Sequence, residues 1–240
     1  MAHRYFTKDI QENRACITGN DARHLAQVLR AEAGQPLILC DGQGTDYKAV
    51  ITHVAADRIE AEVFSRAKSS VEPSVWAEVA LGYARGERLE WAIQKSVELG
   101  ASVIRPFFSA RCVVKPKKEE EKNRRYTRIA EEAAKQCGRG ILPVVAMPVL
   151  FEELIKTVTE QCGQSLFFYE SGGASLRSVL KEKNKVALIT GPEGGFSPEE
   201  AALAVQYGCH SVGLGPRILR SETAPAAALA ALMTLTGNLE

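Results

Sequence analysis

The stretch LITGPEGGFSPEE, residues 188–200, decides the fold, because an apolar run leads there into a glycine-rich loop and then into the start of a helix. A second stretch, VGLGPRILRSETAPAAA at residues 212–228, repeats the plan of apolar run, glycine loop and helix. Neither stretch contains the phosphate-binding pattern G-x-x-x-x-G-K-[ST] or the dinucleotide-binding pattern G-x-G-x-x-G. The pair of loops therefore predicts a ligand site of another kind.

The helix after the first loop has a complete start signal. Ser197 is placed as its N-cap, Pro198 as its first residue, and Glu200 three residues after the serine, which makes a capping box. Gly208 is expected to end the helix. Helix N-termini attract anions, but Glu199 and Glu200 already place negative charge at the positive end of this helix dipole. This argues against a phosphate ligand at the first loop.

Outward from these loops, apolar strands alternate with helices from about residue 75 onward. Strands are expected at 74–84, 102–108, 144–149, 165–170 and 185–190, and helices at 86–100, 119–138 and 151–161. In the helix at 86–100, the spacing places one apolar face on Leu89, Ala92, Ile93, Ser96 and Val97. Alternating strands and helices indicate a parallel sheet that is covered on both faces.

The first 65 or so residues follow a different pattern. Short runs rich in β-branched residues, at 36–42, 46–55 and 57–65, are separated by Gly and Asp turns. One helix is expected at 20–30, with Asn20 or Asp21 as its cap. The polar segment 65–74 ends this part, so the sequence predicts a small β-rich domain at 1–70 and an α/β domain at 71–240.

The composition is that of a globular protein with a sizeable core, at 45% hydrophobic and 25% charged residues over 240 positions. The formal net charge is +1, so any nucleic-acid surface must be local. The sequence shows no signal peptide and no apolar run of 18 residues, and we expect a cytoplasmic protein. The six cysteines have no C-x-x-C spacing, so we expect reduced, structural thiols and no metal site.

Both glycine loops are expected at the carboxyl edge of the parallel sheet, where ligands bind in open α/β folds. Their glycines let backbone N–H and C=O groups approach a neutral, hydrogen-bonding ligand such as an adenine. The alternative is that both are only tight turns.

The motifs ITGPEGGFSPEE and LGPRILRSETAPAAAL together resemble the paired C-terminal signature of the 16S ribosomal RNA uridine-N3 methyltransferase family. That family belongs to the knotted, S-adenosylmethionine-dependent RNA methyltransferases known as SPOUT. The segments KSVELGASVIRPFFSARC, RIAEEAAKQCGR and HLAQVLR also resemble the family, so the likeness covers nearly the whole chain. It implies a PUA-like β-barrel that binds RNA, followed by a SPOUT domain whose end is threaded into a trefoil knot. It also implies a homodimer.

Under this resemblance the two loops hold one S-adenosylmethionine. The residues expected to bind it, mainly through backbone groups, are Glu170, Thr190, Gly191, Glu193, Gly195, Leu214, Gly215, Ile218 and Leu219. A second acid is expected after Glu170, but Ser171 occupies that position, which leaves the ribose contact open.

Two residues are candidates for the chemistry. Arg220 is expected to stabilise the negative charge that spreads over the uracil oxygens as N3 loses its proton. Glu222 is the candidate base, provided that burial raises its pKa. The alternative for Arg220 is a surface arginine paired with Glu222.

RNA binding is expected along a basic segment and on the N-terminal domain. Residues 111–139 contain ten basic against five acidic side chains, which suits phosphate contacts but is also typical of a solvated helix face. The candidates are Arg4, Arg14, Arg23, His24, Arg30, Arg111, Lys115, Arg124, Arg125 and Arg217. His24 could equally cap or pack.

Other functions remain open at this point. A knotted methyltransferase acting on transfer RNA or on another ribosomal base would share the cofactor site. A non-catalytic RNA-binding assembly factor would keep the fold, although intact loop glycines argue against it. A nucleotide hydrolase is disfavoured, because the sequence has no phosphate loop and no metal-ligand cluster.

Overall fold

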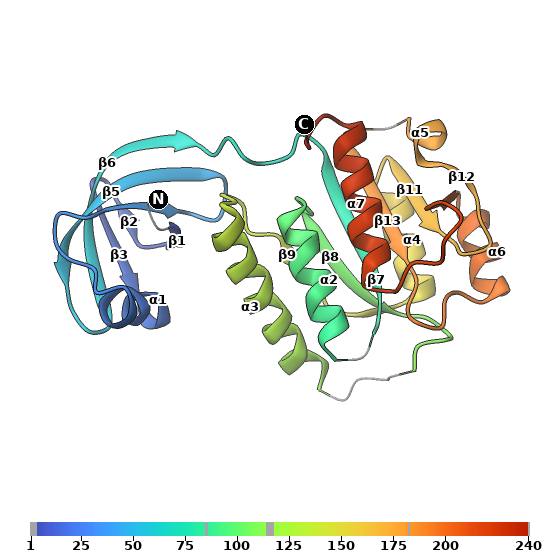
Figure 1. Ribbon diagram of the computed structural model, residues 1–240, viewed down its shortest axis with the longest axis horizontal. Helices are drawn as coiled ribbons and strands as arrows, with labels where there is room; N and C mark the ends of the chain where they lie inside the picture. Colours follow the sequence, from blue (N-terminus) through green and yellow to red (C-terminus); the bar gives the residue numbers. More distant parts are fainter. Residues whose placement is uncertain (1–3, 85, 114–117, 182, 240) are drawn as a thin grey trace. The chain divides into compact units, whose positions relative to one another are not determined.

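Figure 1 shows the computed structural model of the chain, which describes residues 4–84, 86–113, 118–181 and 183–239. The chain forms two compact units. The first comprises Met1–Glu72 and Ala134–Leu142, and the second comprises Pro73–Ala133 and Pro143–Glu240. The first unit thus takes in a segment from the middle of the chain. Among the described residues, no helix is both long and apolar enough to cross a membrane.

The first unit is built on one curled six-stranded sheet (Figure 1). Its strand order is β1-β4-β5-β6-β3-β2; β1 pairs with β4 in parallel, and the other pairings are antiparallel. One face of the sheet buries apolar side chains such as Leu39, Ala49 and Ile59. This confirms the small β-rich N-terminal domain. The strands are β1 (Arg4–Phe6), β2 (Ile10–Gln11), β3 (Arg14–Thr18), β4 (Pro36–Cys40), β5 (Thr45–Val54) and β6 (Arg58–Lys68).

The helix expected at 20–30 is present but differs in detail. It consists of α1 (Gly19–Arg23) and a π-helical turn, η1 (His24–Val28). The predicted cap was wrong, because the N-cap is Thr18, the last residue of β3. The chain passes from strand to helix without a loop, so Asn20 and Asp21 fall inside the helix.

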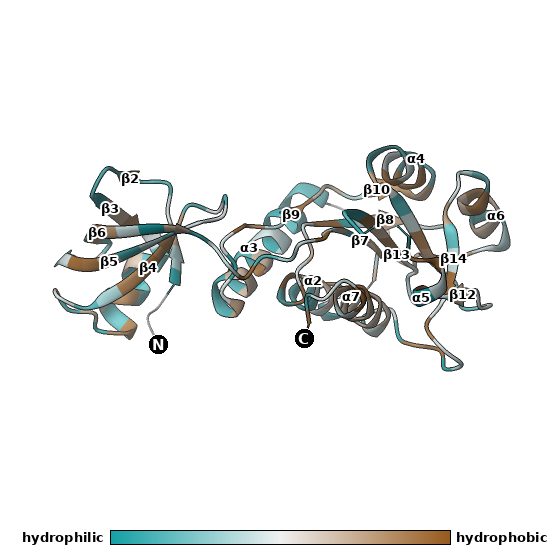
Figure 2. Ribbon diagram, turned by 90° about the horizontal axis from the view of Figure 1, so that it is seen from above, coloured by the Kyte–Doolittle hydropathy of each residue, from teal (hydrophilic) through white to brown (hydrophobic). Residues whose placement is uncertain are grey.

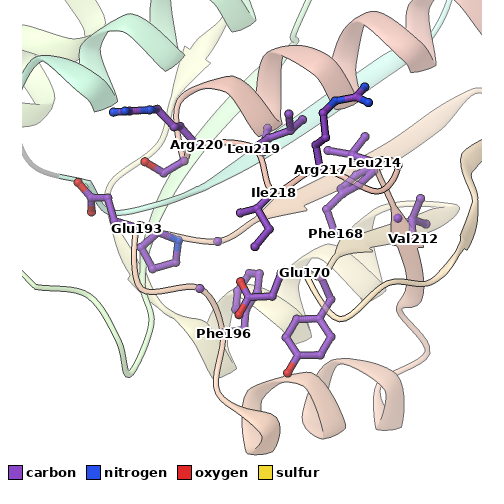
Figure 3. A pocket seen from close by; sticks show the side chains of 18 of the residues that line it. Phe168, Glu170, Glu193, Phe196, Val212, Leu214, Arg217, Ile218, Leu219 and Arg220 are labelled. Carbon is purple, nitrogen blue, oxygen red and sulfur yellow. The ribbon is translucent and has the colours of Figure 1, made fainter.

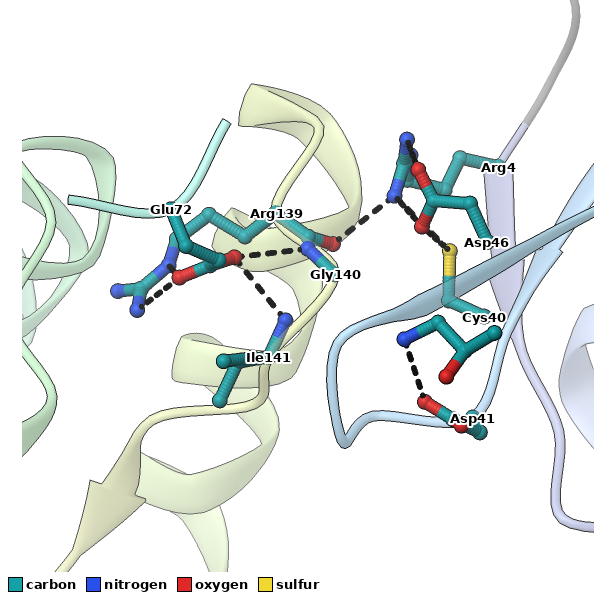
Figure 4. Close-up of polar contacts among 9 residues, drawn as sticks. Arg4, Cys40, Asp41, Asp46, Glu72, Arg139, Gly140 and Ile141 are labelled. Atoms are coloured by element: carbon teal, nitrogen blue, oxygen red, sulfur yellow. Dashed lines mark hydrogen bonds and ion pairs between the residues drawn. The ribbon is translucent and has the colours of Figure 1, made fainter. Parts of the chain in front are cut away.

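Glu72 fastens the segment 134–142 to the rest of the first unit (Figure 4). Its carboxylate accepts hydrogen bonds from Arg139 Nη2 at 2.8 Å and Nε at 3.1 Å. It also accepts bonds from the backbone N–H groups of Gly140 at 2.9 Å and Ile141 at 3.0 Å. Arg139 is only 4% exposed, so this carboxylate balances a buried charge.

Replacing Glu72 with alanine is expected to lower the free energy of unfolding by about 3 kcal/mol, because a buried guanidinium and two backbone donors lose their acceptor. Urea denaturation measures the change. Glu62→Ala is the matched control, since Glu62 is an exposed carboxylate on β6, and should stay within about 0.5 kcal/mol of the wild type. Equal losses in the two variants would contradict the role given to Glu72.

The second unit is organised around an eight-stranded sheet in which the described strand pairs are all parallel. The strand order is β10-β8-β7-β13-β11-β14-β12, with β9 also beside β8. This confirms the parallel α/β domain. The single strand expected at 144–149 is divided in two, because Pro148 has no N–H to donate to a ladder. The strands are β7 (Trp76–Gly82), β8 (Val103–Phe108), β9 (Val144–Val145), β10 (Val149–Leu150), β11 (Gln164–Phe168), β12 (Ala174–Ser175), β13 (Lys185–Thr190) and β14 (His210–Gly213).

Helices cover both faces of this sheet (Figure 2). Helices α2 and α7 pack together on one face, and α4 and α6 pack on the other. The buried residues of α2 are the five that the helical spacing predicted, and the chain leaves this helix through Gly100 with φ +96°. The helices are α2 (Glu87–Glu98), α3 (Glu119–Cys137), α4 (Phe151–Gln161), α5 (Leu176–Val179), α6 (Pro198–Gln206) and α7 (Thr223–Leu235).

The start of α6 confirms the predicted capping box. The Glu200 N–H donates to Ser197 Oγ at 3.2 Å, and the Ser197 N–H donates to Glu200 Oε2 at 2.9 Å. Pro198 is the first residue of the helix, as expected. The reciprocal bonds fix the point at which the first glycine loop becomes helix.

Candidate functional site

A cavity of about 360 Å³ lies between the two glycine loops, at the carboxyl ends of β11, β13 and β14 (Figure 3). Its lining comes from residues 168–172, from the first loop at 191–196 and from the second loop at 212–224, with Arg88 from the first turn of α2. This volume lies within the range of about 300–1,000 Å³ that is typical of small-molecule sites. The position is the one where open parallel sheets bind ligands.

Eight of the nine predicted cofactor residues line this cavity, and one does not. Thr190 is 1% exposed, and its hydroxyl donates to the Ala80 carbonyl on β7 at 3.2 Å. Its side chain therefore serves the packing of the sheet. The eight lining residues are Glu170, Gly191, Glu193, Gly195, Leu214, Gly215, Ile218 and Leu219.

The first loop requires glycine at Gly195 for two separate reasons. Gly195 has φ +66°, a left-handed conformation that favours glycine. A Cβ there would also collide with the Glu170 carboxylate. The loop is closed by a hydrogen bond from the Gly195 N–H to the Pro192 carbonyl at 2.9 Å. The turn thus holds its backbone against an acidic side chain in the cavity.

The first loop is also pressed against the neighbouring strand and against the core. A Cβ on Gly82, at the end of β7, would collide with the backbone nitrogen of Pro192. A Cβ on Gly191 would lie 3.0 Å from the ring of Phe196, which is 2% exposed. Phe196 packs against Phe167 with ring centroids 4.4 Å apart. The loop is therefore anchored independently of any ligand.

The second loop presents apolar side chains to the cavity. Ile218 is 88% exposed, and Figure 3 shows it facing Glu170 across the cavity. Leu214 and Leu219 are half-buried in the same wall. Gly215 has φ +91° and turns the chain after β14. An exposed isoleucine above a cavity is a surface that an apolar ring would cover.

Glu170 is the acid that faces into the cavity. It follows β11 and is exposed to solvent. Ser171, at the position where a second acid was expected, is not among the lining residues. The serine at position 171 therefore does not alter the lining of the cavity. The Glu170 carboxylate remains to accept hydrogen bonds from hydroxyl groups of a ligand.

Arg88 is a site residue that the sequence reasoning missed. Its Nη1 atom pairs with Glu193 Oε1 at 2.9 Å, and both residues line the cavity. The two are 105 residues apart in the sequence. In the sequence, Arg88 looks like any exposed residue of an amphipathic helix. No local signal could have identified it, because only the packing of the sheet brings α2 to the first loop.

Arg220 and Glu222 both line the cavity but do not form the ion pair considered as an alternative. Glu222 Oε2 accepts a hydrogen bond from Ser221 Oγ at 3.1 Å. Within the described residues the structure shows no partner for the Arg220 guanidinium. Figure 3 shows Arg220 and Arg217 extending from opposite ends of the second loop. Arg220 is therefore available to a substrate.

The predicted RNA contacts of the first unit divide into two groups. Arg4 forms two bonds of 2.8 Å to the Asp46 carboxylate, donates to the Arg139 carbonyl at 3.3 Å, and is 14% exposed (Figure 4). Its charge is already balanced inside the domain, so the structure argues against its assignment to RNA. His24 Nδ1 lies 3.5 Å from the Tyr5 hydroxyl. The exposed candidates are Arg14, Arg23, His24 and Arg30.

The basic segment is less available than its composition indicates. Lys135 pairs with Asp21, Arg139 with Glu72, and Arg125 with Glu90, which leaves fewer cations for phosphate. Lys115 lies outside the described residues. Arg111 and Arg124 are exposed, as is Arg217 in the second loop.

None of the six cysteines, all of which lie in the described ranges, lines the cavity. Burial raises the pKa of the Cys112 thiol, in the loop after β8. Burial also raises the pKa of Cys209 to about 12 and that of Cys162 to about 11. These thiols are protonated at neutral pH, so the reactive thiolate form is scarce. No group of three or more His, Cys, Asp or Glu in the described ranges could hold a metal ion.

Both parts of the chain match families of RNA methyltransferases. Residues 71–233 match a family model described as an RNA methyltransferase domain, and residues 17–64 match an RNA methyltransferase PUA domain. The ribosomal RNA small subunit methyltransferase E of Bacillus subtilis is 34% identical over 226 residues, covering 90% of this chain and 88% of that protein.

Two of the solved structures that resemble nearly the whole chain contain S-adenosylmethionine. The ribosomal RNA small subunit methyltransferase E of Neisseria gonorrhoeae, bound to S-adenosylmethionine, is 29% identical with a TM-score of 0.90, and 98% of each chain is covered. A Legionella pneumophila methyltransferase in complex with the same cofactor is 30% identical, also with a TM-score of 0.90 and 98% of each chain covered.

Proposed function

Because the chain belongs to the family of ribosomal RNA small subunit methyltransferase E, we propose that it transfers a methyl group from S-adenosylmethionine to N3 of a specific uridine in 16S ribosomal RNA. The observation that carries this proposal is the cavity between the two glycine loops. It lies in the part of the chain that matches the RNA methyltransferase domain.

The residues of the cavity fit this cofactor. Leu214, Ile218 and Leu219 offer an apolar wall for the adenine, and Glu170 offers a carboxylate for the ribose hydroxyls. The glycine backbone of both loops supplies hydrogen-bonding groups at close range. S-adenosylmethionine, when bound, supplies a methyl group on a positively charged sulfur.

The chain's own part in the reaction is positioning and charge stabilisation. As uridine N3 loses its proton, negative charge spreads onto O2 and O4; that charge would be consumed when N3 bonds to the methyl carbon and the bond from this carbon to the sulfur breaks. In this proposal Arg220 stabilises that charge and Glu222 accepts the proton. N3 lies on the Watson–Crick edge, so the base must be unpaired or turned out of a helix to reach the cavity.

We assign RNA binding to the PUA-like domain and to basic residues of the second unit. Arg14, Arg23, His24 and Arg30 would contact the RNA from the first unit. Arg111, Arg124 and Arg217 would do so from the second, together with Arg125, which pairs with Glu90 but keeps a side chain that is 66% exposed. Such phosphate contacts set the orientation of the RNA, while the cavity selects the base.

Four further properties belong to the proposal through the family. The protein acts in the cytoplasm on the small ribosomal subunit, and it forms a homodimer that completes the site. Its C-terminal segment forms a trefoil knot. The return of the chain from β14 to α7, which packs against β13 and β7, supports that path.

A methyl-transfer assay with labelled S-adenosylmethionine tests the function. Small subunits that lack the modification, naked 16S RNA and bulk transfer RNA are offered side by side, and the modified base is mapped. The expected result is 3-methyluridine in 16S RNA, with assembled subunits as the better substrate, because a nearly neutral protein needs the shape of the RNA as well as its charge.

The other outcomes decide between the remaining functions. Label in transfer RNA, or on another ribosomal base, would support the assignment as an RNA methyltransferase but contradict the proposed substrate. Cofactor binding without transfer to any RNA would overturn the enzyme and favour an RNA-binding assembly factor.

A further inference from the structure

We propose that Glu200 is a positioning residue for the RNA: its carboxylate ties the loop that carries Arg111 to the first glycine loop of the cofactor cavity. This inference rests on the proposed function. The Arg111 loop, residues 109–113, follows β8 at the carboxyl edge of the same parallel sheet. It therefore leaves the sheet on the side where the cavity lies.

Glu200 makes one bond more than a capping box needs. Its Oε2 atom accepts the Ser197 N–H at 2.9 Å, which completes the cap of α6. Its Oε1 atom accepts the N–H of Ala110 at 2.8 Å, 90 residues away in the sequence. Glu200 is only 9% exposed, and a charged acceptor of this kind makes a strong hydrogen bond. The second bond links α6 to the Arg111 loop.

Arg111 and Gly194 form a second contact between the same two loops, in which the Arg111 guanidinium donates to the Gly194 carbonyl. Arg111 Nη1 lies 3.4 Å from the Gly194 carbonyl. A Cβ on Gly194 would lie 2.8 Å from the Arg111 carbonyl, so only glycine permits this approach. Gly194 does not have a positive φ, and the space is therefore the reason for glycine at this position. Glu200 and Gly194 together form the tether.

The two ends of the tether are anchored unequally. The first glycine loop is held by Phe196, whose ring lies 5.5 Å from that of Phe151 and 4.4 Å from that of Phe167. Within the Arg111 loop, the backbone N–H groups of Arg111 and Cys112 reach back only to Ser109, at 3.2 and 3.1 Å. Loss of the tether should therefore release the Arg111 loop and leave the cofactor loop in place.

The consequence concerns RNA, not the cofactor. Arg111 is exposed and projects from a loop that touches the cavity wall, so it can bind an RNA phosphate close to the target base. A phosphate contact gives orientation only when its side chain is held in place. Glu200 supplies that restraint without touching the RNA.

The decisive variant is Glu200→Gln, which keeps the shape of the side chain but cannot accept both N–H groups. We expect the KM for RNA to rise about tenfold, with kcat and the Kd for S-adenosylmethionine within about twofold of the wild type. The slope of log affinity for RNA against log salt should fall by about 0.7 to 0.9, which is the loss of one phosphate contact.

Ser197→Ala is the matched control. It removes the other half of the cap on the same helix turn but leaves the Glu200–Ala110 bond. It should destabilise the protein while leaving the KM for RNA and the salt slope unchanged. If Ser197→Ala raises the KM as much as Glu200→Gln does, the effect belongs to the cap and the tether is overturned.

A double-mutant cycle with Arg111→Ala completes the test. If Glu200 acts through Arg111, Glu200→Gln adds nothing to the KM in the Arg111→Ala background. Additive effects would overturn the tether. Gly194→Ala disturbs the tether at the first glycine loop, because its Cβ would meet the Arg111 carbonyl. It should raise the KM for RNA as Glu200→Gln does, and it replaces Glu200→Gln if that variant does not fold. A wild-type protein that transfers no methyl group would contradict the proposed function itself, which is a distinguishable failure.

Discussion

Replacing Arg220 with alanine is expected to lower kcat by about 10² to 10³, the usual cost of removing one preorganised group that stabilises developing charge. The Kd for S-adenosylmethionine should change by less than about threefold, because the guanidinium extends away from the middle of the cavity (Figure 3). Steady-state methyl transfer on small subunits measures kcat, and calorimetry measures cofactor binding. Arg220→Lys should recover only a small part of the activity, because an ammonium cannot reproduce the planar fork of the guanidinium.

Arg217→Ala is the control from the same loop. Arg217 is exposed and lines the cavity, as Arg220 does, but is assigned to RNA phosphate. Its removal should raise the KM for RNA and leave kcat within about threefold of the wild type. If the two variants lost kcat equally, or if Arg220→Ala kept full activity, the assignment of Arg220 to the transition state would be wrong.

Replacing Gly195 with alanine is expected to weaken S-adenosylmethionine binding by about 100-fold. A left-handed φ of +66° costs an alanine about 1–2 kcal/mol. The added Cβ also collides with the Glu170 carboxylate, so this flexible end of the side chain must move from its place in the cavity wall. Gly195 and Glu170 both line the cavity, and calorimetric titration with the cofactor measures the loss.

Gly208→Ala is the control that distinguishes the effect of backbone strain alone from the effect of a change in the cavity wall. Gly208 also has a positive φ, +91°, but nothing lies within 4 Å of the added Cβ and the residue is outside the cavity. It should cost about 1 kcal/mol of stability and leave cofactor affinity unchanged. Wild-type affinity in Gly195→Ala would contradict the role of this loop.

The elements that the sequence predicted best are those set by local chemistry. The helix at 151–161 and the strand at 185–190 were predicted with the bounds that the structure has. The capping box of Ser197 and Glu200 was predicted correctly, because a cap is satisfied within one turn of chain. The buried face of α2 followed from helical spacing alone.

The structure differs from the prediction where the role of a residue depends on a neighbouring element. Asn20 and Asp21 are good caps, but β3 runs directly into α1 and makes Thr18 the cap. Arg4 is a free cation in the sequence and is neutralised by Asp46, 42 residues away. Thr190 follows an apolar strand like a ligand-binding residue, yet its hydroxyl bonds to Ala80 across the sheet. Each outcome depends on a partner that local sequence does not reveal.

The sequence by itself determined the alternation of strands and helices, the two glycine loops and the family to which they point. These are properties of short segments, governed by periodicity, capping and the freedom of glycine. Only the tertiary structure decided which charges remain available. It pairs Arg88 with Glu193 and leaves the Arg220 guanidinium without a partner among the described residues. It also gives Glu200 a second bond, to Ala110. The physical reason is that electrostatic partnership depends on distance in space, and the parallel sheet brings together residues about 90 to 105 positions apart in the chain.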